Sequence, residues 1–166
     1  MRILCLGWES EGAGVNMRLY LVQHGEATPE DVNPERPLTE KGRTDSQKTA
    51  VSLKKTGITL SSIWHSTKTR TRETASIFAR ELSVKRVEQR EGLAPNDPVD
   101  EVCSSIASME DDIMIVGHLP FLQKLASVLI TGSETSGIVK FTMAGCVCLE
   151  RDESSKWVSV FAIIPE

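Results

Sequence analysis

Two short apolar runs constrain the fold of this chain more than any other feature of its sequence. Residues 19–22 and 113–116 contain only aliphatic, aromatic or thioether side chains. A strand that is apolar along its whole length is buried on both faces, and such strands are typical of parallel sheets covered by helices. These runs therefore predict two central strands of an α/β fold.

The segments around these runs carry helix signals. Thr39 can cap a helix that runs to about Lys55, and Ser66 can cap a second helix. Pro120 suits the first turn of another helix, which we expect to end at Gly132.

Weaker patterns predict the remaining elements. We expect strands at 63–64, 84–87, 145–151 and 156–164, and a short helix at 97–109. The last two strands are joined by a short turn, which favours antiparallel pairing. The alternation of strands and helices predicts a three-layer α/β/α sandwich around a mostly parallel sheet.

Composition is consistent with one globular domain. The 166 residues carry a net charge of −4, so the bulk charge gives no sign of nucleic-acid or membrane-surface binding. No apolar run reaches the roughly 20 residues of a membrane span. The four cysteines form no C-x-x-C pair, which favours reduced thiols and a cytoplasmic location.

The first residues differ from the rest. An apolar patch at residues 3–6 is followed by a loose, glycine-containing stretch, and a strand then opens at Met17. We interpret residues 1–16 as an N-terminal extension and residues 17–166 as a single domain. The alternative is that the extension contains a real edge strand.

The histidines of the chain share one position. His24, His65 and His118 each stand at the carboxyl end of a predicted strand, where open α/β sheets bind ligands. A strand-end histidine is often only structural, but Gly25 and Gly117 beside two of them allow close backbone approach to a ligand. We expect His65 to be structural. A metal site is disfavoured because no clear carboxylate joins the histidines, and we expect no cofactor.

Helix spacing separates Arg70 from its neighbours. Arg70 lies four residues before Thr74 and seven before Ile77, on the inward face of the second helix. Arg72 falls on the solvated face, and Lys68 is expected at the surface. An inward arginine near a helix N-terminus requires an anionic partner, for which phosphate is well suited.

These segments resemble the histidine phosphatase superfamily, also called the phosphoglycerate mutase-like family. Four stretches carry the resemblance, in matching order over roughly residues 17–164: residues 19–27 with Gln23-His24-Gly25-Glu26, residues 36–42, residues 66–75, and Gly117-His118-Leu119-Pro120. The last stretch and the compact length are similar to the SixA branch of phosphohistidine phosphatases.

The resemblance implies site residues and a function. His24 would be phosphorylated and then hydrolysed, Arg70 and His118 would hold the phosphoryl oxygens, and Gln23, Gly25 and Glu26 would line the substrate site. The expected function is removal of phosphate from phosphohistidine in a signalling protein, by a monomer that binds neither nucleic acid nor membrane. The alternatives are a phosphatase of small phosphate esters and a weakly active phospho-ligand-binding module.

Gln23 departs from the family pattern, which has arginine there. The lost charge predicts activity lower by about ten- to thirtyfold, which Gln23→Arg would restore. Alternatively, Arg36 or Lys68 already supplies the charge, and the added arginine would bring no gain.

The general acid is left open among three carboxylates, Glu26, Glu91 and Asp97. An imidazole leaving group needs less protonation than an alkoxide, which favours phosphohistidine over sugar phosphates.

Overall fold

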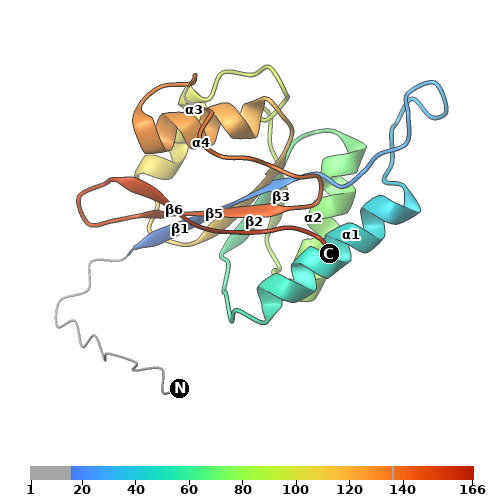
Figure 1. Ribbon diagram of the computed structural model, residues 1–166, viewed down its shortest axis with the longest axis horizontal. Helices are drawn as coiled ribbons and strands as arrows, with labels where there is room; N and C mark the ends of the chain where they lie inside the picture. The colour runs from blue at the N-terminus through green and yellow to red at the C-terminus, as the bar shows by residue number, and fades with distance from the viewer. Residues whose placement is uncertain (1–15, 136) are drawn as a thin grey trace.

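A computed structural model describes residues 16–135 and 137–166 (Figure 1). Residues 1–15, which hold nearly all of the predicted extension, lie outside the described residues. The described strands form one six-stranded sheet in the order β3-β2-β4-β1-β5-β6. The strands are β1 Met17–Gln23, β2 Ser62–His65, β3 Val87–Gln89, β4 Ile113–Gly117, β5 Cys146–Arg151 and β6 Trp157–Ile163.

The helices cover both faces of this sheet, as Figure 1 shows. They are α1 Glu40–Lys54, α2 Thr69–Leu82, α3 Asp100–Ala107 and α4 Phe121–Thr131. Helices α1 and α2 pack on one face, and α3 and α4 lie on the other. The predicted three-layer α/β/α sandwich is therefore confirmed.

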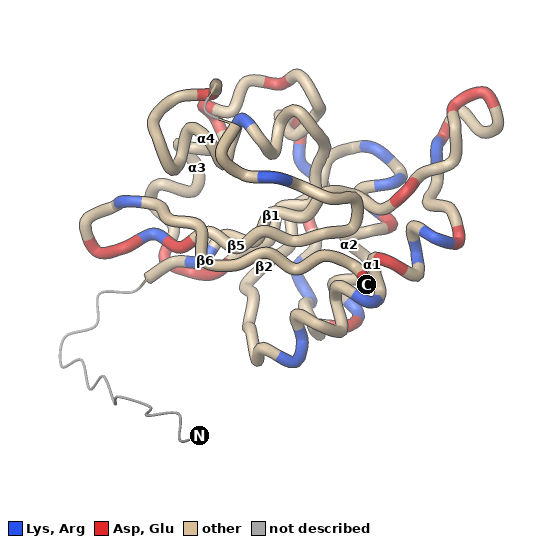
Figure 2. Tube along the Cα trace, viewed as in Figure 1, with Lys and Arg blue, Asp and Glu red and all other residues tan. Residues whose placement is uncertain are grey.

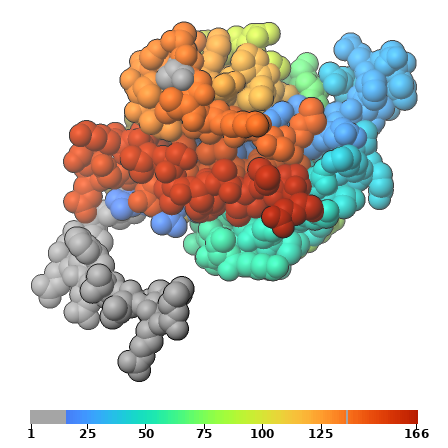
Figure 3. All heavy atoms as spheres, in the orientation of Figure 1, coloured from blue at the N-terminus to red at the C-terminus, as the bar shows by residue number. Residues whose placement is uncertain are grey.

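The sheet is mixed, with its parallel part at the centre. Strand β4 pairs in parallel with β1 and β2, and β2 pairs in parallel with β3. Strands β5 and β6 add antiparallel pairings next to β1, as the short turn between them predicted. In Figure 3 this hairpin and the segment after it run across the front of the molecule.

The two sides of β1 explain its continuous apolar run. Leu19 and Leu21 belong to the core cluster under α3 and α4, whereas Tyr20 and Val22 belong to the cluster under α1 and α2. All four are fully buried. Cys146 and Cys148 also pack in the second cluster, which agrees with a packing role for these thiols.

Strand β3 and helix α3 both begin later than predicted. Strand β3 starts three residues late, because Ser83 adopts a left-handed conformation and the amide of Val84 still bonds to Ala79 in α2. Helix α3 starts late because the Asp97 carboxylate accepts the amide of Ala94 in a preceding turn.

Ser66 does not cap α2 as predicted. The helix begins at Thr69, its cap residue is Lys68, and no side chain bonds to its first amides as a cap. The Ser66 hydroxyl lies 2.8 Å from the Thr71 hydroxyl and 2.6 Å from Nε2 of His118 instead. Thr39, by contrast, caps α1 as predicted, since its hydroxyl accepts the amide of Gly42.

Candidate active site

The carboxyl ends of the parallel strands bring two histidines together. His24 follows β1 and His118 follows β4, and these strands pair so that Gln23 lies opposite Gly117. The amide of His24 donates to the carbonyl of Gly117 at 3.1 Å. The two imidazole rings are 5.1 Å apart between centroids, in an edge-on arrangement.

The hydrogen bonds of His24 determine which ring nitrogen is free. Its Nδ1 lies 2.8 Å from the carbonyl oxygen of Gly25, so Nδ1 carries the proton and donates it. Nε2 then keeps its lone pair and accepts Nε–H of Arg70 at 3.3 Å. Burial lowers the pKa of His24, and the positive charges of Arg70 and Arg36 lower it further. A neutral imidazole of this kind is suited to act as a nucleophile.

His118 is buried more deeply. Its side chain is 2% exposed, and burial lowers its pKa to about 3, with added effects from His24 and from the cations Arg70, Lys68 and Arg36. Its Nε2 contacts the Ser66 hydroxyl, whereas its Nδ1 has no hydrogen-bond partner among the described residues. One ring nitrogen of His118 is therefore left for an additional partner.

Arg70 faces inward, as its helix spacing indicated. It lies in the first turn of α2 and reaches Nε2 of His24, while Thr74 one turn later accepts the amide of Gly25 at 3.1 Å. Arg72 is exposed on the opposite face of the helix.

The third histidine, His65, is buried at the end of β2 and bonds through Nδ1 to the carbonyl of Ser66, which agrees with a structural role.

The two residues after His24 contact α1. A Cβ atom on Gly25 would lie 2.6 Å from the carbonyl oxygen of Gly42, so this glycine is needed for close approach to the helix. Glu26 accepts the amide of Thr39 through its carbonyl and the Thr39 hydroxyl through its carboxylate. Both residues anchor the loop after β1 to the start of α1.

Gln23, at the end of β1, is 8% exposed. The backbone amide of Gln23 donates to the carbonyl of Gly145, and its side-chain oxygen has no hydrogen-bond partner among the described residues. The position that carries arginine in the family pattern is thus an uncharged and largely buried amide.

Arg36, which the sequence indicated only as an alternative source of charge, lines the same cavity as Arg70. It lies at the end of the loop 28–37, which is closed by a bond from the amide of Thr28 to the carbonyl of Pro37. Its positive charge lowers the pKa of His24, of Arg70 and of His118. The guanidinium of Arg36 therefore acts on all three predicted site residues.

A cavity of about 350 Å³ lies beside these groups. It is lined by Glu30, Pro34, Glu35, Arg36, Thr67, Lys68, Thr69 and Arg70. The loop that forms one wall projects at the upper right of Figure 2 and carries acidic residues at its tip. Three cations and two carboxylates around one cavity favour an anionic ligand.

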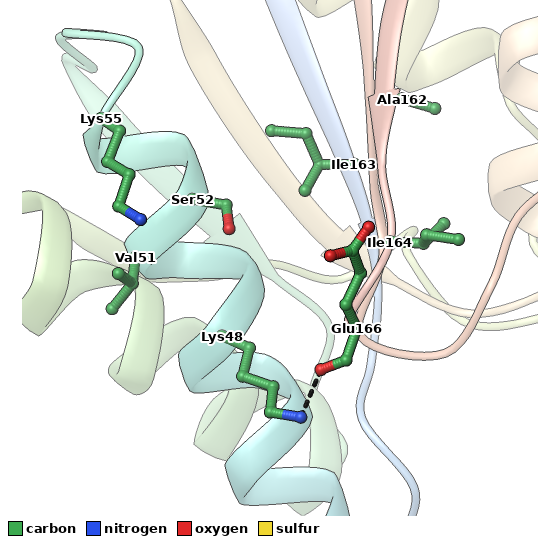
Figure 4. Close-up of a pocket in the computed structure, with 8 residues that line it drawn as sticks. All are labelled: Lys48, Val51, Ser52, Lys55, Ala162, Ile163, Ile164 and Glu166. Atoms are coloured by element: carbon green, nitrogen blue, oxygen red, sulfur yellow. Dashed lines mark hydrogen bonds between the residues drawn. The ribbon is translucent and has the colours of Figure 1, made fainter.

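Another cavity is separate from these residues. It measures about 530 Å³ and lies between α1 and the end of β6 (Figure 4). Lys48 on one side donates to the backbone carbonyl of Glu166 on the other. None of the histidines or arginines described above lines it.

The three carboxylates considered as general acids have other contacts or positions. Glu26 bonds to Thr39, Asp97 bonds to the amide of Ala94, and Glu91 lines a different cavity beside Trp64. None of these carboxylates is among the groups that shift the pKa of His24 or His118. Within residues 16–135 and 137–166, no three His, Cys, Asp or Glu side chains converge as metal ligands.

Comparison with known proteins points to one family over part of the chain. Residues 19–97 match the profile of the histidine phosphatase superfamily (branch 1), over a span that contains His24, Arg36 and Arg70. This span is just under half of the chain, and over it the chain is similar to the histidine phosphatase superfamily. It is also 29% identical to an uncharacterized protein of Picosynechococcus, over 80% of this chain and 84% of that protein.

Solved structures of this superfamily share the fold. The protein histidine phosphatase SixA complexed with tungstate superposes with a TM-score of 0.80 at 22% identity, covering 90% of this chain and 97% of SixA. Phosphoglycerate mutase from Plasmodium falciparum superposes with a TM-score of 0.68 at 16% identity, covering 89% and 91%. The fold is thus phosphoglycerate mutase-like, as predicted, and the superfamily supports a phosphatase activity. No helix among the described residues has the length and apolar character to cross a bilayer.

Proposed function

We propose that this chain removes phosphate from phosphohistidine in a protein, through a covalent intermediate on His24. The observation that carries the proposal is the state of the His24 ring. Its Nδ1–H donates to the Gly25 carbonyl, and its Nε2 lone pair faces Arg70 at 3.3 Å. A neutral imidazole with a free nitrogen beside a cation is prepared to attack a phosphorus atom.

The reaction has two displacements. In the first, the bond between phosphorus and the leaving-group nitrogen breaks, a bond from phosphorus to Nε2 of His24 forms, and the leaving imidazole takes up a proton. In the second, water attacks the phosphorus, the bond to Nε2 breaks, and inorganic phosphate leaves. Arg70, which contacts Nε2 of His24, and His118, whose ring lies 5.1 Å from that of His24 between centroids, stabilise the phosphoryl oxygens during both steps.

The substrate class follows from the leaving group. The three candidate carboxylates have other contacts or line another cavity, so a substrate whose leaving group needs little protonation suits this site. An imidazole leaves near neutral pH with less assistance than an alkoxide requires. The structural likeness to SixA, whose structure is described as a protein histidine phosphatase, agrees with this assignment.

A second candidate function is suggested by Gln23. An uncharged amide at the family's arginine position weakens transition-state stabilisation more than it weakens binding, which is consistent with a phospho-ligand-binding module of low activity. Hydrolysis of small phosphate esters remains the alternative within enzymes.

One labelling experiment distinguishes these functions. The protein is mixed with a histidine-phosphorylated protein carrying ³²P, quenched at high pH within milliseconds, and assayed for phosphoenzyme and released phosphate. We expect a burst of alkali-stable, acid-labile label that is absent in His24→Ala and retained in Arg72→Ala. Binding without any label would support the module, and turnover of p-nitrophenyl phosphate alone would support an ester phosphatase. Undiminished phosphate release by His24→Ala would rule out the covalent mechanism.

A further inference from the structure

The end of β1 lacks the charge that the family pattern places there. Gln23 occupies this position, and its side chain is neutral and almost entirely removed from solvent. A transferring phosphoryl group carries two negative charges or nearly so, and charge-assisted hydrogen bonds to it are roughly twice as strong as neutral ones. Of the two arginines that the family pattern places at positions 23 and 70, this chain has only Arg70.

Arg36 is held at the site by its own backbone and side chain. Its φ of +48° is in the left-handed region, which is unusual for a residue with a Cβ atom. Its amide donates to the carbonyl of Asn33, and its Nε donates to the carbonyl of Thr28 at 3.2 Å. The Nε bond uses one side of the guanidinium and leaves the two terminal nitrogens for another partner.

The charge of Arg36 is not neutralised within the described part of the chain. Seven ion pairs join other basic residues to carboxylates there, but neither Arg36 nor Arg70 forms one. Both arginines line the same cavity, and Arg70 also contacts His24. Two guanidinium groups that share one cavity and form no ion pair with a carboxylate favour an anion as ligand of that cavity.

From this arrangement we infer that Arg36 and Arg70 together bind the phosphoryl group, and that Arg36 supplies the second guanidinium that position 23 lacks. The inference rests on the proposed function and assigns a substrate-binding role to a residue of the loop 28–37. It resolves the two alternatives for Gln23: an arginine added at position 23 would meet Arg36 rather than fill a vacancy.

The inference predicts a specific pattern among three variants. Arg36→Gln lowers kcat/KM by at least about tenfold, because it removes a charge-assisted contact to the transition state. Gln23→Arg in the otherwise unchanged protein gives no increase. The double variant Arg36→Gln/Gln23→Arg regains most of the lost activity, because the arginine at position 23 then provides the second guanidinium beside that of Arg70.

The measurements are kcat/KM for p-nitrophenyl phosphate and for a histidine-phosphorylated protein, together with calorimetric affinity for inorganic phosphate. Arg72→Gln is the matched control, since it makes the same chemical change on the exposed face of α2, and melting temperatures verify folding. If Arg36 only supported the structure of the loop, the double variant Arg36→Gln/Gln23→Arg would not regain the activity that Arg36→Gln loses.

Two outcomes would overturn the inference. One is an Arg36→Gln variant that binds phosphate as tightly as Arg72→Gln, and the other is a gain of about tenfold or more from Gln23→Arg alone. The phosphate affinity is measured without turnover. Failure of the phosphatase proposal, seen as absence of phosphoenzyme, therefore remains distinguishable from failure of the Arg36 assignment.

Discussion

At the scale of single residues, the candidate site depends on contacts between groups far apart in the chain. His24 and Arg70 are separated by 46 residues and meet at 3.3 Å, and Ser66 and His118 are separated by 52 residues and meet at 2.6 Å. Each of these residues lies beyond the carboxyl end of a strand in the parallel part of the sheet, so the register of these strands sets the separation of the side chains. The chemistry therefore depends on the sheet more than on any local motif.

Arg70 and Arg72 provide a test of this geometry. Arg70→Ala removes the guanidinium that contacts Nε2 of His24, and we expect kcat/KM to fall by about a hundredfold or more. Arg72→Ala alters an exposed side chain on the other face of α2 and should change kcat/KM less than about twofold. Steady-state kinetics of both variants on one substrate is the measurement. Equal losses would show that the orientation of α2 is wrong.

His118 links stability to pH. Its pKa falls from 6.5 to about 3 on folding, so between these values the unfolded chain binds more protons than the folded one. Stability is therefore fully present above about pH 6.5 and decreases as the pH falls toward 3. Urea unfolding at pH 7 and pH 5 should show a decrease that is smaller in His118→Asn, by up to about 2 kcal/mol. An identical decrease in the variant would contradict the burial of a neutral imidazole.

At the scale of elements, the start of α1 and the loop after β1 form one unit. Thr39 caps the helix and bonds to Glu26, and Gly25 and Gly42 allow the two backbones to touch. A Cβ atom on Gly42 would lie 2.1 Å from the carbonyl oxygen of Glu26, a distance that no small adjustment relieves. The loop that carries His24, the proposed nucleophile, is thus positioned by a helix whose N-terminus requires glycine.

Gly42→Ala should therefore be harmful although alanine is the better helix former. The favourable propensity is about 1 kcal/mol, and the backbone clash should outweigh it, giving a net loss of about 1–3 kcal/mol in unfolding free energy. Activity should fall as well, because the loop must move with its helix. Chemical denaturation and kinetics are the measurements. Thr44→Ala, at an exposed position of the same helix, is the control and should not destabilise the protein.

The sequence predicted the elements better than their contacts. The apolar runs of β1 and β4 and the spacing of α2 were sufficient for the layers and for the inward face of Arg70, because burial on a strand or helix has a regular period. The cap predicted at Ser66 is wrong, because its hydroxyl contacts a long-range partner, His118. The contact between Gly25 and Gly42 is likewise long-range and was not predicted. No periodic pattern of the sequence could indicate where Arg36 lies, because a loop residue is positioned by its own turn.

At the scale of the whole molecule, the helices and strands described from Met17 onward form one sheet with a helical layer on each face. Strand β1 pairs with β4 from Leu19 to Gln23 and with β5 from Met17 to Val22, and its first residue, Met17, is fully buried opposite Arg151. The core under each layer includes residues of this central strand. The described core is therefore built around β1.

Removal of residues 1–16 should accordingly have little effect. We expect the melting temperature to change by less than about 8 °C and kcat/KM to remain within about twofold, because no described core residue is deleted. Thermal unfolding and kinetics of the shortened chain provide the check. A larger decrease in melting temperature would mean that the deleted segment packs against the domain.

The bonding of the site backbone also sets how fast its amides exchange with solvent deuterium. The His24 amide is bonded to Gly117 within the central sheet, whereas the Arg36 amide is bonded to Asn33 within a surface loop. Amides of central strands exchange only when the whole molecule opens, and loop amides exchange through small local openings. Bound phosphate should therefore slow exchange at Arg36 by restraining the loop, while His24 keeps the slow exchange rate of the sheet.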